Sequence, residues 1–183
     1  MTTTLKLTYE DYLYLAEDRQ RHEIHDGVHV VTPAPSPEHQ SIVMNLGSML
    51  QGHLREHGLG RVLSSPVDVV LSETDVVQPD LIVLLADRLD RVRDTHIAGA
   101  PSLVIEVLFE STRRRDEITK RHLYALHGVE EYWIVDPVLE SVKLYRTGEG
   151  GFELAAELFA ESNDTLSADR LPGLAIDVVD IFA

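Results

Sequence analysis

Glu106 is an acidic residue inside an otherwise apolar run, residues 103–109. The run is short, rich in β-branched residues and preceded by Gly99-Ala100-Pro101, which predicts a buried strand. Burying an ionised carboxylate costs several kcal/mol unless a partner pairs with it or a cation coordinates it. A second apolar run, residues 79–85, carries Asp80 near its start. Two acids on adjacent core strands therefore predict a divalent metal site.

Length and composition limit the class of protein. A chain of 183 residues, of which 44% are hydrophobic and 26% charged, fits one globular domain, expected to span residues 1–183. The chain contains no cysteine, which excludes disulfides, thiolate zinc sites and cysteine nucleophiles. Neither a signal peptide nor a run of about 18 apolar residues is recognisable, so we expect a cytoplasmic protein without a membrane span.

The net charge of −15 is unlike that of a generic nucleic-acid-binding protein, which carries a basic surface. The charge is uneven, however, because a basic window shortly after Glu106 could contact phosphates. A solvated helix face with ordinary ion pairs explains the same window equally well. The window contains Arg113, Arg114, Arg115, Lys120 and Arg121, against the acids Asp116 and Glu117.

Turn and capping signals divide the chain into helices and strands. Asp26-Gly27 is typical of a two-residue hairpin turn, and Ser36 followed by Pro37 predicts the start of a long helix that Gly58 ends. The predicted helices are 9–18, 37–57 and 116–126, and the predicted strands are 62–63, 67–71, 80–85, 103–108 and 131–136, followed by a hairpin of 142–145 with 152–154. An apolar tail, 171–176, leads into a short turn at 178–182.

This order of elements predicts an α/β or α+β fold, in which a mixed central sheet is flanked by helices. If the strands 79–85 and 102–108 run antiparallel, Asp80 lies beside Glu106. Like charges opposed across a strand pair are destabilising, so this register requires a cation. Mg²⁺ prefers oxygen ligands, often one or two carboxylates, and the Val107 carbonyl could add a third oxygen. Alternatively, Asp80 merely begins a strand.

Lys120 lies on the predicted helix that follows the Glu106 strand. A lysine close to a metal-bound water can orient the water and stabilise the charge that develops on a phosphate. From spacing alone, an exposed lysine paired with Asp116 at i,i+4 is the favoured alternative. Tyr124, four residues after Lys120, shares its face and could line the same cleft.

Several blocks, in the same order, resemble a known protein family. Pro79-Asp80, Glu106-Val107-Leu108 and Lys120 are similar to the motif of the PD-(D/E)XK nuclease superfamily, although Leu108 occupies the usual lysine position. The closer resemblance is to the Uma-type restriction endonucleases of bacteria, in which a lysine from the following helix takes over. The matching blocks are 22–27, 33–39, 77–80, 99–108, 116–120, 124–137 and 171–174.

The resemblance implies a restriction-endonuclease-like fold and a set of catalytic residues. Asp80 and Glu106, with the carbonyl of Val107, would bind Mg²⁺, for which Mn²⁺ would substitute. Lys120 would serve the attacking water. Glu23 matches an N-terminal acid of the family that would help to hold the metal or a metal-bound water.

The resemblance and the basic window together predict a nucleic-acid-binding surface. His39 matches a recurring histidine of the family, and arginine can grip a phosphate with two parallel hydrogen bonds. Where the family usually has Ser-Pro, Phe109-Glu110 stand here and add a negative charge beside the cleft. The predicted nucleic-acid contacts are His39, Arg113, Arg114, Arg115, Arg121 and Tyr124.

We therefore expect a magnesium-dependent endonuclease that acts on DNA, as a homodimer with one site for each strand. Two other classes of function remain open. One is a non-catalytic nucleic-acid-binding or regulatory protein on the same fold, and the other is a hydrolase of smaller phosphate esters. His22, His25 and His29 lie close together but lack a standard zinc spacing, which favours solvated hairpin histidines over a zinc site.

Overall fold

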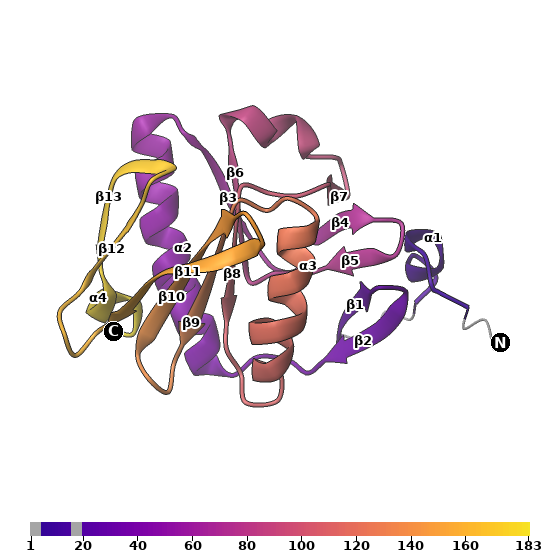
Figure 1. Ribbon diagram of the computed structural model, residues 1–183, viewed down its shortest axis with the longest axis horizontal. Helices are drawn as coiled ribbons and strands as arrows, with labels where there is room; N and C mark the ends of the chain where they lie inside the picture. Colours follow the sequence, from indigo (N-terminus) through magenta and orange to yellow (C-terminus); the bar gives the residue numbers. More distant parts are fainter. Residues whose placement is uncertain (1–4, 16–19) are drawn as a thin grey trace.

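A six-stranded mixed sheet lies at the centre of the computed structural model, which describes residues 5–15 and 20–183. Its strand order is β11-β10-β9-β8-β6-β3 (Figure 1). β8 and β9 are parallel and all other neighbours are antiparallel, so the predicted mixed sheet is confirmed. The strands are β3 (Gly60–Ser64), β6 (Leu81–Leu85), β8 (Leu103–Val107), β9 (Glu131–Asp136), β10 (Ser141–Gly148) and β11 (Gly151–Phe159).

A second sheet, of five strands, has the order β2-β1-β5-β4-β7. The predicted hairpin at Asp26-Gly27 is confirmed, and both residues have the positive φ that such a turn requires. The sequence expectations lack β5 and β7, because each strand is only three residues long and shows no alternating pattern. The strands are β1 (Arg21–His25), β2 (Val28–Thr32), β4 (Asp68–Ser72), β5 (Asp75–Val77) and β7 (His96–Ala98).

Helix α2 (Pro37–His57) packs on one face of the six-stranded sheet (Figure 1). The predicted start of this helix is confirmed, because the Ser36 side chain caps it by accepting a hydrogen bond from the backbone amide of His39. Gly58 ends the helix in the left-handed conformation, also as predicted. The helix therefore holds His39 in its first turn, at the edge of the sheet layer.

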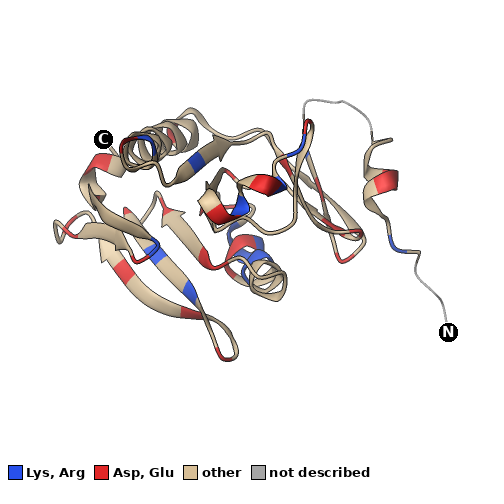
Figure 2. Ribbon diagram, turned by 90° about the horizontal axis from the view of Figure 1, so that it is seen from above, with Lys and Arg blue, Asp and Glu red and all other residues tan. Residues whose placement is uncertain are grey.

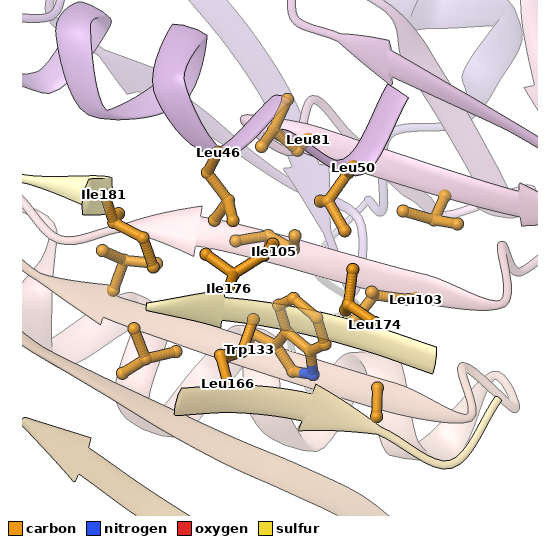
Figure 3. Close-up of a cluster of buried hydrophobic side chains, with 14 of the residues drawn as sticks. Leu46, Leu50, Leu81, Leu103, Ile105, Trp133, Leu166, Leu174, Ile176 and Ile181 are labelled. Atoms are coloured by element: carbon orange, nitrogen blue, oxygen red, sulfur yellow. The ribbon is translucent and has the colours of Figure 1, made fainter. Parts of the chain in front are cut away.

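The C-terminal segment closes the core on the α2 side. β12 (Thr165–Ala168) and β13 (Leu171–Asp177) pair as a two-stranded sheet and lead into α4 (Val178–Ile181). The sequence predicts the apolar tail and the last turn, but not this pairing. Figure 3 shows side chains from α2, the central sheet and β13 packed together, among them Leu46, Leu50, Ile105, Trp133 and Ile176.

A second helical segment and the five-stranded sheet cover the opposite face of the central sheet. The segment is helical from 113 onwards, contains a π-helical turn (Arg115–Lys120) and continues as α3 (Arg121–Leu126). Ile82 and Val104 point into the core on this side. Successive strand residues alternate between faces, so Asp80 and Glu106 share this face with them.

β6 and β8 run antiparallel, with Leu81 opposite Ile105, which is the condition set above for Asp80 to lie beside Glu106. The first helix is shorter than predicted, because α1 covers only Tyr9–Tyr12, and residues 16–18 of the predicted helix lie outside the described residues. A 3₁₀ helix, Ala86–Arg91, follows β6. No helix in the described part of the chain is long and apolar enough to cross a membrane.

Candidate active site

Three donors from three different elements hold the carboxylate of Asp80, which immediately precedes β6. Nη1 of Arg21 on β1 donates to Oδ1 at 2.8 Å, and the backbone N–H of Val107 on β8 donates to Oδ2 at 2.9 Å. Nε2 of His39 on α2 lies 3.1 Å from the same Oδ2. Burial alone would raise the pKa of Asp80, but His39 and Arg21 hold it below its ordinary value. Asp80 is therefore ionised in its buried position.

Lys120 joins two further buried acids. Its Nζ lies 2.9 Å from Oε1 of Glu106 on β8 and 2.9 Å from Oε1 of Glu23 on β1. Nζ also lies 3.7 Å from Asp116, the i,i+4 partner that the sequence suggested. Lys120 is only 4% exposed, however, so the interpretation as an exposed helix lysine is wrong.

The π-helical turn brings Asp116 and Lys120 to the buried side of the helix. Such turns are rare and occur frequently at functional sites. Tyr124 follows one turn later, and its hydroxyl donates to Oε1 of Glu106 at 2.7 Å. Oε1 of Glu106 therefore receives hydrogen bonds from both Lys120 and Tyr124, which fixes the orientation of this carboxyl group.

The two carboxyl groups that share Lys120 have opposite pKa shifts. Burial raises the pKa of Glu106 to about 8, because three neighbouring acids offset the attraction of Lys120. Burial would also raise the pKa of Glu23, but Lys120, His25 and the backbone N–H of Gln78 together hold it well below its ordinary value. Burial lowers the pKa of Lys120, yet the surrounding acids raise it above its ordinary value, so Nζ remains protonated at neutral pH.

A small pocket opens beside this cluster. Asp80, Glu106 and Lys120 line it, and the loop 33–35 between β2 and α2 contributes to its wall. The pocket therefore brings the predicted metal-binding and water-activating residues to one space. Glu23 is fully buried and is absent from the pocket wall, so in this structure it contacts Lys120 from behind rather than facing the pocket.

Among the arginines of the basic window, Arg115 faces the pocket. Its Nη1 donates to Oγ1 of Thr32 at 3.2 Å, across the pocket mouth from the helix to the end of β2. Arg114 is exposed. Figure 2 shows Lys and Arg gathered along this helix, whereas acidic residues are spread over the other elements. The local basic strip predicted from the sequence therefore lies next to the pocket.

Other predicted nucleic-acid contacts have intramolecular roles instead. Arg113 makes two hydrogen bonds to the carboxylate of Asp136, of 2.6 and 2.9 Å. The guanidinium group of Arg121 lies over the ring of Tyr145, 5.0 Å from its centroid. Tyr124 is fully buried, so the prediction that it contacts a nucleic acid directly is wrong. Its hydroxyl donates a hydrogen bond to Glu106 instead.

His39 is also buried but lines the pocket, and its predicted contact with a nucleic acid stays a prediction. Its Nε2 lies 3.1 Å from the carbonyl oxygen of Val107, in addition to its contact with Asp80. Its second ring nitrogen, Nδ1, is buried and has no hydrogen-bond partner among the described residues. The position of the ring is therefore set by the two oxygens that Nε2 meets.

The donor atoms fit an oxygen-preferring divalent cation. Oδ2 of Asp80 and the carbonyl oxygen of Val107 both contact Nε2 of His39, and Oε2 of Glu106 has no hydrogen-bond donor among the described residues. Within residues 5–15 and 20–183, no three His, Cys, Asp or Glu side chains form a metal-binding group. A cation in the pocket would therefore depend on two carboxylates and a backbone carbonyl, a donor set that suits Mg²⁺.

Sequence reasoning missed two charged residues of the site. Arg21 binds Asp80 from a strand of the other sheet. The two residues are 59 positions apart, and no local sequence pattern predicts a contact over that separation. Asp116 was read only as a surface partner of Lys120, although it is buried. Two signals were available in the sequence: Arg21 directly precedes His22-Glu23, and Asp116 lies four residues before Lys120.

The hairpin histidines differ from one another. His22 and His29 stack with ring centroids 5.1 Å apart and are half-buried. His25 is buried, and its Nε2 lies 3.1 Å from Oε2 of Glu23. The expectation of a solvated histidine is therefore wrong for His25, which instead supports the acid that holds Lys120.

Comparisons with known proteins agree with this architecture. Residues 9–179 match the Uma2 family, described as "Putative restriction endonuclease". The uncharacterized protein slr1290 of Synechocystis sp. is 29% identical over 177 residues, which cover 95% of this chain and 91% of that protein.

A solved structure has the same fold. It is the crystal structure of "a putative nuclease belonging to DUF820" from Anabaena variabilis, and it superposes with a TM-score of 0.79 at 21% sequence identity. The match covers 96% of this chain and 97% of that one.

Proposed function

The chain belongs to the Uma2 family, and on that premise we propose that it is an endonuclease that hydrolyses phosphodiester bonds of DNA with the help of Mg²⁺. One observation carries the proposal: Asp80, Glu106 and Lys120 meet at a single pocket. Structural ion pairs alone seldom place two buried carboxyl groups and a buried lysine beside an opening to solvent.

We assign the proposed roles from the contacts. Asp80, Glu106 and the carbonyl of Val107 would hold Mg²⁺, and Mn²⁺ would substitute for it. When bound, the ion supplies charge neutralisation at the phosphate and an acidified water. Lys120 keeps its proton, so it acts by its positive charge, which favours the negative charge that develops on the phosphate. Glu23 positions Lys120 by sharing Nζ with Glu106.

The proposed DNA contact uses the cationic side of the pocket. Arg115 lines the pocket without a carboxylate partner among the described residues, so its guanidinium group is available to a phosphate. Arg114, exposed on the same helix, would contact the next phosphate. We further propose a homodimer, because two such pockets are needed to cut both strands of a duplex at once. Light scattering at micromolar concentration tests that assembly.

The nuclease activity is tested with supercoiled plasmid and 5 to 10 mM MgCl₂. We expect cleavage by the wild type, abolition by EDTA, and a loss of at least about 100-fold in Asp80→Asn and Glu106→Gln. Glu161→Gln, at an exposed acid far along the sequence, serves as the control for a lost carboxylate. A wild type that cuts no nucleic acid, or variants that cut as fast as the wild type, would refute the proposal.

A second candidate is a nucleic-acid-binding or regulatory protein that does not cut. Both oxygens of Asp80 already have donors, and Glu110 adds negative charge to a chain whose net charge is −15. Calorimetric titration with a short duplex separates the two functions. Binding that is equal in EDTA and in Mg²⁺, without cleavage, would favour this candidate.

A further inference from the structure

A second groove opens beside the candidate active-site pocket, and the side chains of His39 and Phe109 line both. The apolar part of this groove consists of Leu108, Phe109, Pro137 and Val138. Phe109 is 38% exposed and Val138 is 82% exposed, so two apolar side chains face solvent beside the pocket. The proposed hydrolysis uses neither of them.

Hydrogen bonds fix the two loops that carry these side chains. The carbonyl oxygen of Phe109 accepts hydrogen bonds from the backbone amides of Thr112 and Arg113, at 3.0 and 2.8 Å. Oδ1 of Asp136 accepts one from the backbone amide of Val138 at 3.0 Å, and the guanidinium group of Arg113 holds the same carboxylate. Phe109 belongs to neither buried apolar cluster of the described residues. The fold therefore presents its ring to solvent on a fixed backbone, as a preformed binding site does.

The pocket and the groove differ in charge. Arg115 lines the pocket without a carboxylate partner among the described residues, whereas the exposed acids Glu38 and Glu110 line the groove. The arginine of the groove, Arg113, is already paired with a carboxylate. Acidic groups repel a phosphate, but their oxygens accept hydrogen bonds from amino groups. The groove therefore suits an uncharged, flat group with an apolar face and amino groups at its edge, which is the chemistry of a nucleobase.

We propose that the groove binds an unpaired nucleobase of the DNA strand whose phosphate occupies the pocket, with the base stacked on the ring of Phe109. This inference rests on the proposed function and names the form of DNA that the site takes. A base in a duplex must leave the helical stack, at an energetic cost, before it can enter such a groove. Single-stranded DNA avoids most of this cost, so it should bind more tightly than duplex DNA.

The first test measures binding by the whole protein in EDTA at low salt, with a fluorescent single strand of about 12 nucleotides and its duplex. We expect the single strand to bind at least about 10-fold more tightly by fluorescence anisotropy. Phe109→Leu keeps an apolar side chain without the ring and should weaken single-strand binding at least about 5-fold, whereas Phe109→Trp should retain it. Tyr14→Leu, at an exposed aromatic residue that follows α1, is the matched control and should bind as the wild type does.

Three results would overturn the inference. One is the absence of single-strand binding, and another is equal affinity for the single strand and the duplex. The third is an unchanged affinity in Phe109→Leu. If that variant instead changes the mass measured by light scattering, the groove is an interface between copies of the chain and not a nucleobase site.

A second measurement locates the base directly. A 5-iodouracil base in the single strand forms a photochemical cross-link to an aromatic ring that stacks on it, and mass spectrometry identifies the residue. We expect the cross-link at Phe109 in the wild type, and a cross-link only elsewhere would overturn the inference. A cross-link at Phe109 in a protein that cuts no DNA in Mg²⁺ would refute the nuclease proposal alone. Cleavage of DNA without a cross-link at Phe109 would refute only the role of the groove.

Discussion

Replacing Glu106 by glutamine should change how the stability of the protein depends on pH. Burial raises the pKa of Glu106 to about 8, against an ordinary value of 4.5. Between these two pH values the folded protein keeps a proton that the unfolded chain has released. The free energy of unfolding therefore falls as pH rises through this window, because stability falls wherever the native state binds more protons.

The magnitude follows from the same two values. Each unit of pKa difference corresponds to 1.36 kcal/mol, so this carboxyl group alone removes roughly 5 kcal/mol between pH 4.5 and 8. Glutamine has no proton to lose and retains an oxygen that can accept the hydrogen bond from Tyr124. Glu106→Gln should thus be close to the wild type in stability at pH 5, and should exceed it by several kcal/mol at pH 8.

Guanidinium unfolding in EDTA at pH 5, 6.5 and 8 measures this difference, and EDTA keeps cations away from the carboxyl group. Titrating groups distant from Glu106 are the same in both proteins and cancel in the comparison, and Lys120 stays protonated across this pH range. Glu161→Gln, at an exposed position, should follow the wild type at all three pH values. Parallel stability curves for the wild type and Glu106→Gln would show that Glu106 ionises normally and would refute the reasoning.

Three further outcomes follow from the contacts described above. Lys120→Met removes the positive charge that pairs with the buried acids Glu23 and Glu106. The free energy of unfolding, measured in urea, should fall by about 3 to 5 kcal/mol. A loss below about 1 kcal/mol would contradict the stabilising role of Nζ. Gly60→Ala places a Cβ 2.1 Å from the Leu84 carbonyl oxygen and should destabilise the folded protein more than Gly58→Ala does. A Cβ at Gly58 meets no atom within 4 Å, so Gly58→Ala costs only about 1 kcal/mol for the positive φ of that position. Equal melting temperatures of the two variants would contradict this packing. Arg115→Ala should weaken DNA binding, measured by fluorescence anisotropy, and should reduce the slope of log affinity against log salt concentration by about 1. An unchanged slope would show that Arg115 does not contact a phosphate.

The sequence was most informative at Glu106. A charge is so costly to bury that its presence in an apolar strand predicts a partner, and the structure provides Lys120 from the helix that was expected to carry it. The hypothesis that the two strands pair antiparallel placed Asp80 beside Glu106, and the observed register, with Leu81 opposite Ile105, agrees with it. These features could be predicted because strand length and the cost of charge burial are local properties of the sequence.

The remaining features depend on contacts between distant segments. Arg21 reaches Asp80 from another sheet, and Arg113 and Arg121 are occupied by intramolecular partners that lie 23 or more positions away. Tyr124 was expected in the cleft, but its burial depends on how the helix is rotated against β8. Helical spacing shows which residues share a face, not which face the rest of the protein covers.

The π-helical turn adds one residue to the helix between two fixed points. Arg113 anchors the helix to Asp136 before the turn, and Tyr124 anchors it to Glu106 after the turn. A π-helical turn bonds residue i to residue i+5, so it holds one residue more than the α-helical turn that it replaces. Loss of one position between 115 and 120 would therefore close the segment into a regular α-helix with both anchors still in reach of their partners. A one-residue deletion here would thus keep the helix and its two anchors, and would lose only the bulge that holds Nζ of Lys120 against the acids.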